Sequence, residues 1–433
     1  MRIKASDRPK SENAKMVFFI IIYRIILDLI YTNQLSRIFR YTGFNSQFDI
    51  LLFALSWFLL ALSIPMIKRC TYEDEFSDVI MLFLIYLSYI PFTTMVAYYN
   101  YSWQFILANS TYWLVFFVSF RYLPHTAGKI GIRTDNKEKI LLFIEAVFGV
   151  AIIYISWRYT GFRFTISLAD VYTYRAEARM ASMPTILSYI FAASKAINPV
   201  LLVYSLKRRN YWNSAFIIIL QILSYSINGS KTVFFSTVSA VILFFIYDRK
   251  YLKRIPDLLS AVTLISFLET AIFHSIFVLS YFVRRVLFLP NQLGYLYFDF
   301  FSKNEPDYYR QSFLRLFGFS SPYEDIDHVI GGEYFNRFEM GANNGLISDA
   351  ITNWGIVGII VMPVILVIVL RFLDKCASGI DKRIYIVTSV TFAFIIMSSF
   401  LPTVLLTHGL LALSLVLMIL PRETDDDKQM NEL

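Results

Sequence analysis

The chain has few of the residues that metal and redox sites need. Its 433 residues include only two cysteines and four histidines. Neither type shows the spacing of a metal site, so the sequence predicts no metal ligands. Cys70 and Cys376 fall in segments expected to face the cytoplasm, where thiols stay reduced, so no disulfide is expected. There is also no Walker loop and no dinucleotide fingerprint, and we therefore expect no cofactor and no use of cytoplasmic ATP.

Charge is scarce as well. Charged residues make up 17% of the chain, whereas a soluble protein carries about 25%. Hydrophobic residues reach 57% and lie in blocks, many of them long enough to cross a bilayer, which takes roughly 20 residues per helix. We therefore predict an all-α polytopic membrane protein, with residues 1–433 forming a single integral membrane domain of about 12 transmembrane helices. The spans are expected at 16–34, 48–67, 79–98, 103–121, 140–157, 185–206, 212–228, 232–247, 257–283, 345–370, 384–401 and 403–420.

The positive charge predicts the orientation of these spans. With the N-terminus in the cytoplasm, 25 of the 40 basic residues fall on the cytoplasmic side, 13 on the opposite side and two within spans. This asymmetry follows the positive-inside rule. The net charge of +8 is thus a topology signal, and no nucleic acid is expected as a partner. Both termini are predicted to be cytoplasmic, including an acidic tail at 421–433. The first span contains Arg24 and Asp28 and lacks a cleavage site, so it is expected to be an uncleaved anchor.

Two extracytoplasmic segments, 158–184 and 284–344, are too long to be simple turns. Long loops in compact proteins are usually functional or disordered. The second is too apolar and aromatic for disorder. We expect it to fold back on the membrane surface as short amphipathic helices, and we expect the chemistry on this outer face.

Arg175 and Arg179 form the first candidate site, in the stretch DVYTYRAEARM at 170–180. If this stretch is helical, Tyr172 and the two arginines share one face. Two guanidinium forks on one face suit phosphate or pyrophosphate oxygens. The alternative is that both arginines reach toward lipid headgroups.

Three further groups lie on the same predicted side of the membrane. Arg284 and Arg285 stand at the outer end of the ninth span, where interfacial anchoring is the alternative. Lys231 belongs to the turn NGSK at 228–231 and is a plausible anion contact. Near the tenth span, Asn343 or Asn344 is expected to cap the helix. Asp349 and Asn353 are spaced to share a helix face, and polar groups this close to hydrocarbon usually face a cavity.

Four segments, in order across roughly 165–360, resemble the O-antigen (Wzy-type, oligosaccharide repeat-unit) polymerases of bacterial inner membranes. They are DVYTYRAEAR, NGSKTVFF, RRVLFLP with GYLYFDFF, and GGEYF with ANNGLISDAITNWGIVG. The resemblance implies a membrane glycosyltransferase that transfers a growing glycan from undecaprenyl pyrophosphate to a fresh lipid-linked repeat unit on the periplasmic face. The product would be a surface polysaccharide, either O-antigen or capsule, and the other partners would be a chain-length regulator and a flippase.

The resemblance also gives the candidate residues roles. Arg175, Arg179 and Arg284 or Arg285 would hold the donor pyrophosphate, with Lys231 and Asn344 as further contacts. Fixed cations aimed at a developing negative charge are an effective catalytic device. An acceptor hydroxyl also needs a base, for which Asp349, Glu333 and His408 are candidates and Asp349 is favoured. Tyr295 and Tyr297 would stack on sugar rings, unless they form an interfacial belt. Because the first outer loop has one acid, Asp49, and no carboxylate pair, the reaction is expected to be metal-independent.

Two other functions remain open from the sequence. An O-antigen ligase hands a finished glycan to another acceptor, and its sequence would look much the same. A lipid-linked oligosaccharide flippase also needs a cationic cavity, although transporters generally keep short extracytoplasmic connections.

Overall fold

The computed structural model describes residues 10–73, 75–123, 128–132, 134–165, 174, 177, 183–247 and 249–422. Within these ranges every regular element is a helix and there is no strand. Six of the helices are long and apolar enough to cross a membrane. The all-α, multi-pass membrane architecture predicted from the hydrophobic blocks is thereby confirmed, while the count of about twelve spans stays a prediction.

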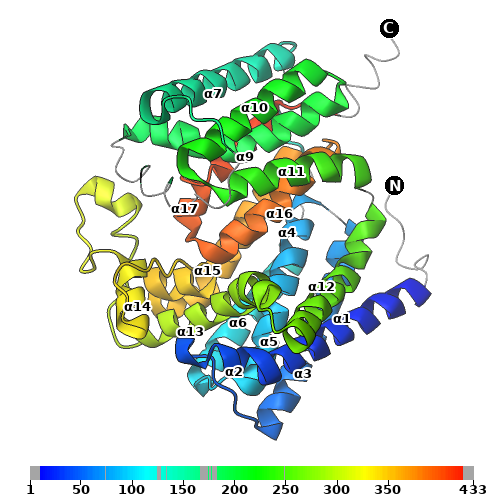
Figure 1. Ribbon diagram of the computed structural model, residues 1–433, viewed down its shortest axis with the longest axis vertical. Coiled ribbons are helices and arrows are strands. Elements are labelled where there is room, and N and C mark those ends of the chain that lie inside the picture. The colour runs from blue at the N-terminus through cyan, green and yellow to red at the C-terminus, as the bar shows by residue number, and fades with distance from the viewer. Residues whose placement is uncertain are drawn as a thin grey trace.

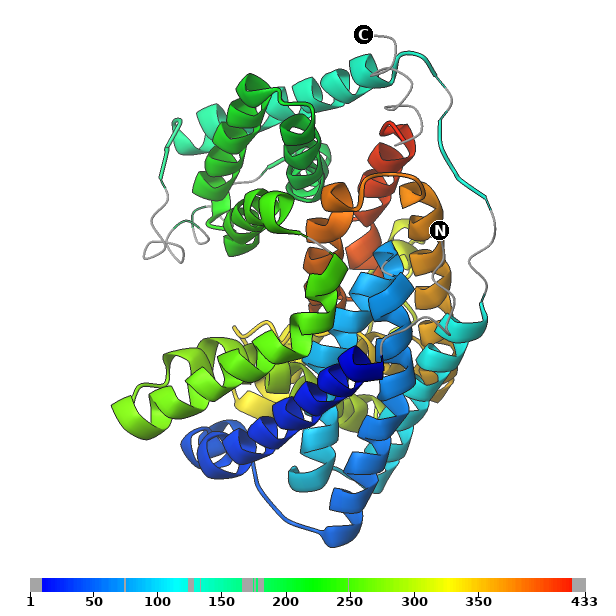
Figure 2. The same cartoon turned by 90° about the vertical axis from the view of Figure 1, so that its right-hand side faces the viewer.

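One layer of the fold is built from the N-terminal helices and α12. Helix α1 packs against α12, and α3 packs against α5. The third apolar block is one rod in which a π-helical segment joins α4 to α5. Figures 1 and 2 show this layer in blue and cyan, with α12 in green lying along α1. Its elements are α1 (Lys10–Ile30), η2 (Tyr31–Leu35), α2 (Ser36–Ile38), η3 (Arg40–Thr42), α3 (Ile50–Glu73), α4 (Phe76–Leu84), η4 (Ile85–Tyr89), α5 (Ile90–Tyr98), α6 (Trp103–Tyr122), η5 (Arg249–Arg254) and α12 (Ile255–Phe273).

A second group contains the middle helices. Helix α10 packs between α7 and α9, and both α9 and α11 reach α16 of the C-terminal group. In Figure 2 this group stands to one side of the blue and cyan layer. Gly229, with φ of +60°, ends α10 and lets the chain turn directly into α11. Its elements are α7 (Lys137–Thr160), α9 (Thr185–Lys207), α10 (Tyr211–Asn228) and α11 (Lys231–Ile246).

The C-terminal helices join these two groups. The longest of them, α15, packs against α6, α13 and α4, while α16 packs against α4, α9 and α11. Within α15, Gly355 has φ of +58°, so its first two turns are set at an angle to the rest. The last apolar block is interrupted at 406–409 and is therefore two helices instead of one. The elements are α15 (Ile347–Ala377), α16 (Lys382–Ser398), α17 (Leu401–Leu405) and α18 (Leu410–Ile419).

The expected ninth span, 257–283, is also broken. Helix α12 ends at Phe273, and His274 adopts a left-handed conformation with φ of +53°. The Glu269 carboxylate accepts hydrogen bonds from the backbone N–H groups of Phe277 and Val278 at 3.1 and 2.9 Å. It thereby caps the start of the next helical stretch. The chain then continues through η6 (Leu279–Phe288), a ten-residue π-helix.

The long segment 284–344 contains short helices, as predicted, and one of them is largely buried in the protein. Helix α13 (Leu289–Phe301) buries most of one face and packs against α15, α5 and α6. It is followed by η7 (Phe313–Phe317) and α14 (Ile326–Phe335). The apolar aromatic stretch that suggested a surface helix is thus part of the protein interior, because its rings are buried against the neighbouring helices.

An ion pair is buried within the first helix. Arg24 is fully buried and pairs with Asp28 one turn later. Its guanidinium donates to Ser56 Oγ on α3 at 3.0 Å and to Thr93 on α5 at 3.1 Å. The indole of Trp57 lies 5.2 Å from the guanidinium. Three helices therefore share the solvation of one charge that hydrocarbon cannot solvate.

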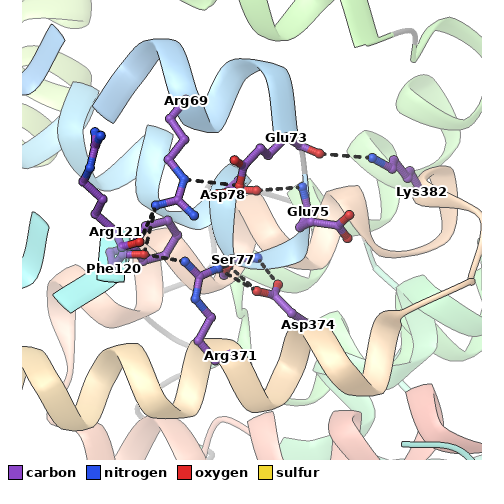
Figure 3. Close-up of polar contacts among 10 residues, drawn as sticks. All are labelled: Arg69, Glu73, Glu75, Ser77, Asp78, Phe120, Arg121, Arg371, Asp374 and Lys382. Atoms are coloured by element: carbon purple, nitrogen blue, oxygen red, sulfur yellow. Dashed lines mark hydrogen bonds and ion pairs between the residues drawn. The ribbon is translucent and has the colours of Figure 1, made fainter. Parts of the chain in front are cut away.

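A second polar cluster fixes the far end of α15 (Figure 3). Arg371 donates to the Phe120 carbonyl at the end of α6 and to Ser77 Oγ at 3.0 Å, and it pairs with Asp374 at 3.0 Å. Arg69 of α3 donates to the same carbonyl at 3.3 Å. Cations at the C-terminus of a helix satisfy its last carbonyls and complement its dipole. This cluster joins α3, α4, α6 and α15 at the end predicted to be cytoplasmic.

Candidate functional site

A polar cavity lies where α13, α14, α15 and α17 meet, in the part of the chain that the sequence predicts to be extracytoplasmic. Its volume is about 170 Å³. The wall carries carboxylates, amides and aromatic rings, and none of the described residues that line it is Lys, Arg or His. The lining residues are Tyr297, Asp307, Tyr309, Gln311, Ser312, Asp325, Ile326, Asp327, Asn343, Asn344, Asn353, Ser399, Phe400, Pro402 and Thr403.

The first turns of α15 form the inner wall of this cavity. The Asn353 amide donates to Asp349 Oδ1 at 2.8 Å, and its oxygen accepts from the Tyr309 N–H at 2.9 Å. The Asp307 N–H donates to the Thr352 carbonyl at 2.6 Å. The loop after α13 is therefore held to α15 at two adjacent residues, through the Thr352 carbonyl and the Asn353 side chain.

Asp349, the favoured base, lies behind this wall. It is 2% exposed, and its Oδ2 accepts the Leu401 N–H at 2.6 Å while Oδ1 accepts from Asn353. It lines a void of about 10 Å³ rather than the larger cavity. Both carboxylate oxygens thus bind protein groups, one of them at the first residue of α17. In this structure Asp349 positions the cavity wall.

The close approach of α15 to α16 makes the Asp349 contact possible. The Gly345 N–H donates to the Met397 carbonyl at 3.0 Å. A Cβ at Gly345 would lie 2.0 Å from the Ile396 oxygen, so no other residue fits without movement of the backbone. The glycine thereby brings the start of α15 against the segment that leads into α17.

Asn344 does not cap the tenth expected span, and neither does Asn343. The residue before α15 is Leu346, and no side chain caps the helix there. Instead, the Asn344 amide donates to the Pro290 carbonyl at 2.9 Å and to Ser348 Oγ at 2.8 Å. Asn344 therefore joins the junction of η6 and α13 to α15, and it also lines the cavity.

The two candidate stacking tyrosines occupy different places. Tyr297 is buried at the cavity, donates to the Ala342 carbonyl at 3.2 Å, and has the Phe400 ring edge-on to it. Tyr295 is instead half-buried among the rings of Tyr99, Tyr101 and Phe105. Only Tyr297 is thus in a position to contact a ligand in the cavity.

Arg284 and Arg285 lie on η6, outside the residues that line the cavity. The Arg284 guanidinium stacks 4.6 Å from the ring of Phe39, and its buried Nε atom has no hydrogen-bond partner. The exposed Arg285 lies 5.3 Å from the Tyr281 ring. Six residues after Arg284, Pro290 accepts the Asn344 hydrogen bond, so η6 is connected to the cavity wall through that amide.

Arg175 and Arg179 lie outside the described residues, and so does Tyr172. The pyrophosphate role of this pair therefore stays a prediction. Of the same segment, Glu177 pairs with Arg163 at 2.6 Å, and the Tyr174 ring lies 4.1 Å from that guanidinium. Arg163 also donates to the Ser226 carbonyl on α10 at 3.1 Å. The only acid between the two arginines is thus already paired with a third one.

The two other base candidates, Glu333 and His408, are not among the residues that line the cavity. Lys231 is the first residue of α11, and its side chain lies outside what the structure describes. Glu333 is exposed on α14. The His408 ring nitrogen Nε2 lies 3.1 Å from Ser399 Oγ.

Asp325 and Asp327 are the functional candidates that the sequence did not single out. They stand at the start of α14 and line the cavity, with Asp325 exposed and Asp327 half-buried. Burial, together with the hydrogen bond and charge of Asp325, raises the pKa of Asp327 to about 6. The sequence pattern that could have identified these two residues is the stretch EDIDH at 324–328, where acids precede a helix. Nothing in that pattern indicated which other segments it would meet.

His328 completes a group of three potential ligands with these two acids. One ligand-type atom of each lies within 4.8 Å of the others. Surface clusters of this composition are common without an ion. The metal-independent reaction therefore stays a prediction, which the addition of a chelator can test.

Comparison of the chain with protein-family models, with curated proteins and with solved structures finds no match. The resemblance to the Wzy-type polymerases consequently rests on the four segments quoted above.

Proposed function

We propose that the protein is a membrane glycosyltransferase that polymerises undecaprenyl-pyrophosphate-linked oligosaccharide repeat units into a surface polysaccharide. The reaction would take place on the periplasmic face of a bacterial inner membrane, in a chain of about twelve spans with both termini in the cytoplasm. The observation that carries the proposal is the cavity between α13, α14, the first turns of α15 and α17. Its carboxylates and amides suit hydroxyl groups, and its aromatic rings suit the apolar faces of a sugar.

The reaction forms one glycosidic bond and breaks one sugar–phosphate bond. A hydroxyl of the acceptor repeat unit attacks the anomeric carbon of the donor, and undecaprenyl pyrophosphate leaves with the electron pair of the broken bond. Arginines around the leaving diphosphate would stabilise the charge that develops on it. Arg175, Arg179 and Arg284 are the candidates, because arginine keeps its charge even where water is scarce.

The hydroxyl proton needs an acceptor, and the arrangement of the carboxylates favours Asp327. Both oxygens of Asp349 already bind protein groups, whereas Asp327 stands in the wall of the cavity. A carboxylate with a pKa near 6 is well matched to accept a proton near neutral pH. Asp349 then acts through Asn353 and Leu401 as a positioning residue.

Reconstitution with a defined lipid-linked repeat unit tests the proposal directly. The purified full-length protein in proteoliposomes should convert the repeat unit into a ladder of longer glycans on a gel. Asp327→Asn should lose the ladder, and the neighbouring exposed carboxylate variant Glu324→Gln should keep it. Transfer of a preformed glycan to another acceptor, without a ladder, would indicate a ligase. Movement of intact repeat units across the bilayer without transfer would indicate a flippase.

The same assay decides the question of metal. The ladder should persist when a chelator is added at an excess over all divalent ions. Inhibition by the chelator, with rescue by a divalent ion, would contradict a metal-independent reaction and would direct attention to Asp325, Asp327 and His328.

A further inference from the structure

The cavity is small, and its charged groups all have one sign. At about 170 Å³ it has the volume of roughly six water molecules of ~30 Å³ each. That is enough for one sugar ring and too little for an oligosaccharide. Three carboxylates, Asp307, Asp325 and Asp327, are among its lining residues, and no basic residue is described there.

These three carboxylates are not equivalent. Asp307 is 1% exposed and serves the protein, because Ser321 Oγ donates to it at 2.6 Å and the Gln311 N–H at 3.0 Å. Asp325 and Asp327 stand at the rim, next to the exposed amide of Asn343. A ligand that enters therefore meets two acids and one amide.

Another part of the wall is apolar. Phe400 and Pro402 line the cavity together with the ring of Tyr297. Carbohydrate rings present hydroxyls at their edge and C–H groups on their faces. A ring lying on this wall would direct its hydroxyls toward the acids and the amide at the rim.

We propose that this cavity is a subsite for a single neutral or amino-bearing sugar and rejects sugars that carry a carboxylate. The inference rests on the proposed function, since the bound ring would be the terminal sugar of the acceptor repeat unit. An acidic sugar would bring a third negative charge beside Asp325 and Asp327. No described lining residue would neutralise that charge, and an unpaired like charge in a partly buried site is costly.

The structure also provides an optical probe of the cavity. The Trp354 indole donates to the Tyr309 hydroxyl at 3.3 Å, and Tyr309 lines the cavity. Occupation of the cavity should therefore change the fluorescence of Trp354. The chain has six tryptophans, so a Trp354→Phe variant identifies which part of the signal belongs to this one.

The experiment titrates the full-length protein in lipid nanodiscs with three monosaccharides, in the absence of any lipid-linked donor. We expect saturable changes in Trp354 fluorescence with a neutral methyl hexoside and with glucosamine. Glucuronate should bind at least tenfold more weakly, which corresponds to a difference in binding free energy of about 1.4 kcal/mol. The signals should vanish in Trp354→Phe. In the double variant Asp325→Asn, Asp327→Asn the discrimination against glucuronate should fall to within about threefold, or ~0.65 kcal/mol. Glu324→Gln, a matched loss of one neighbouring exposed carboxylate, should discriminate as the wild type does.

Three results would overturn the inference. They are equal binding of glucuronate by the wild type, unchanged discrimination in the double variant, and no saturable signal with any of the sugars. These results are separable from the proposed function. A protein that makes the glycan ladder but binds no monosaccharide loses only this subsite. One that binds with the expected preference but makes no ladder keeps the subsite and loses the polymerase activity.

Discussion

Replacement of Asp349 distinguishes a positioning role from a base role. Asp349→Ala removes the acceptor of two hydrogen bonds, from the Leu401 N–H and from the Asn353 amide. Hydrogen bonds to charged groups contribute about 1.5–3 kcal/mol each. The Asn353 amide keeps a longer contact of 3.3 Å with the Asp349 carbonyl, which reduces the loss. We therefore expect the free energy of unfolding to fall by about 3–4 kcal/mol.

Asp349→Asn should cost less, because its amide oxygen still accepts the Leu401 N–H. Its NH₂ group would face the NH₂ group of Asn353, so one hydrogen bond is lost, which costs about 1.5–2 kcal/mol. Both losses can be measured as a fall in the thermal midpoint of the protein in detergent, followed by intrinsic fluorescence. Glu333→Ala is the matched control, since it removes an exposed carboxylate and should change stability by no more than about 0.5 kcal/mol.

The polymerisation assay completes this test. If Asp349 only positions the wall, Asp349→Asn should keep part of the wild-type activity at temperatures where it is folded. The reasoning is refuted if Asp349→Asn unfolds at the wild-type temperature and yet makes no polymer. That result would restore Asp349 as the base.

Three further predictions follow from the described contacts and from the sequence. Arg371→Ala should destabilise the protein by about 3–5 kcal/mol, because it removes the cation paired with the buried Asp374 and one of the two arginine donors to the Phe120 carbonyl. Arg69→Ala, which removes the more exposed of these two donors, should cost clearly less in the same thermal scan. Asp327→Asn should raise the thermal midpoint at pH 8, and this effect should shrink as pH is lowered and be nearly absent at pH 4. The pKa of this carboxyl is raised to about 6 in the fold, so the wild type gains stability as pH falls from about 6 toward 4 and lacks that gain at higher pH. Because water screens this partly exposed group, the stability difference between variant and wild type at pH 8 should be about 1 kcal/mol or less. A lower thermal midpoint for the variant at pH 8 would show instead that the fold favours the charged carboxylate. Arg175→Ala or Arg179→Ala should abolish chain extension while single repeat units still reach the surface. The corresponding Lys variants should recover only part of the chain extension, because an ammonium lacks the bidentate fork. Arg158→Ala removes an exposed arginine at the end of α7 and serves as the control. Normal polymer length in both alanine variants would remove the pair from the site.

Hydrophobic run length predicted most of the helices well. The block 103–121 is α6, Trp103–Tyr122, and the block 185–206 is α9, Thr185–Lys207. These helix boundaries depend on neighbouring residues in the sequence, since a helix ends where apolar residues are followed by polar ones or by a glycine. The breaks at His274 and at 406–409 were not predicted, because each lies inside an apolar block whose composition looks continuous.

The polar contacts of the site could not be read from the sequence in the same way. The partner of Asp349 is a backbone N–H 52 positions away, and Arg284 stacks on Phe39 from a distant part of the chain. Such pairs depend on how α15 meets α17 and how η6 meets η3, which no local pattern records. The cavity acids Asp325 and Asp327 could be assigned to the site only once the start of α14 was seen to line the same cavity as Tyr297 and Asn353.

The buried Arg24 has a consequence for how the protein enters the membrane. During synthesis α1 emerges before α3 and α5, whereas the groups that accept hydrogen bonds from its Arg24 belong to Ser56 of the second apolar block and Thr93 of the third. If α1 spans the bilayer, as its sequence predicts, a lone helix carrying this residue would be costly to release into lipid. We therefore expect the translocation machinery to retain α1 until α5 has emerged, so that the first three blocks partition into the bilayer as one unit.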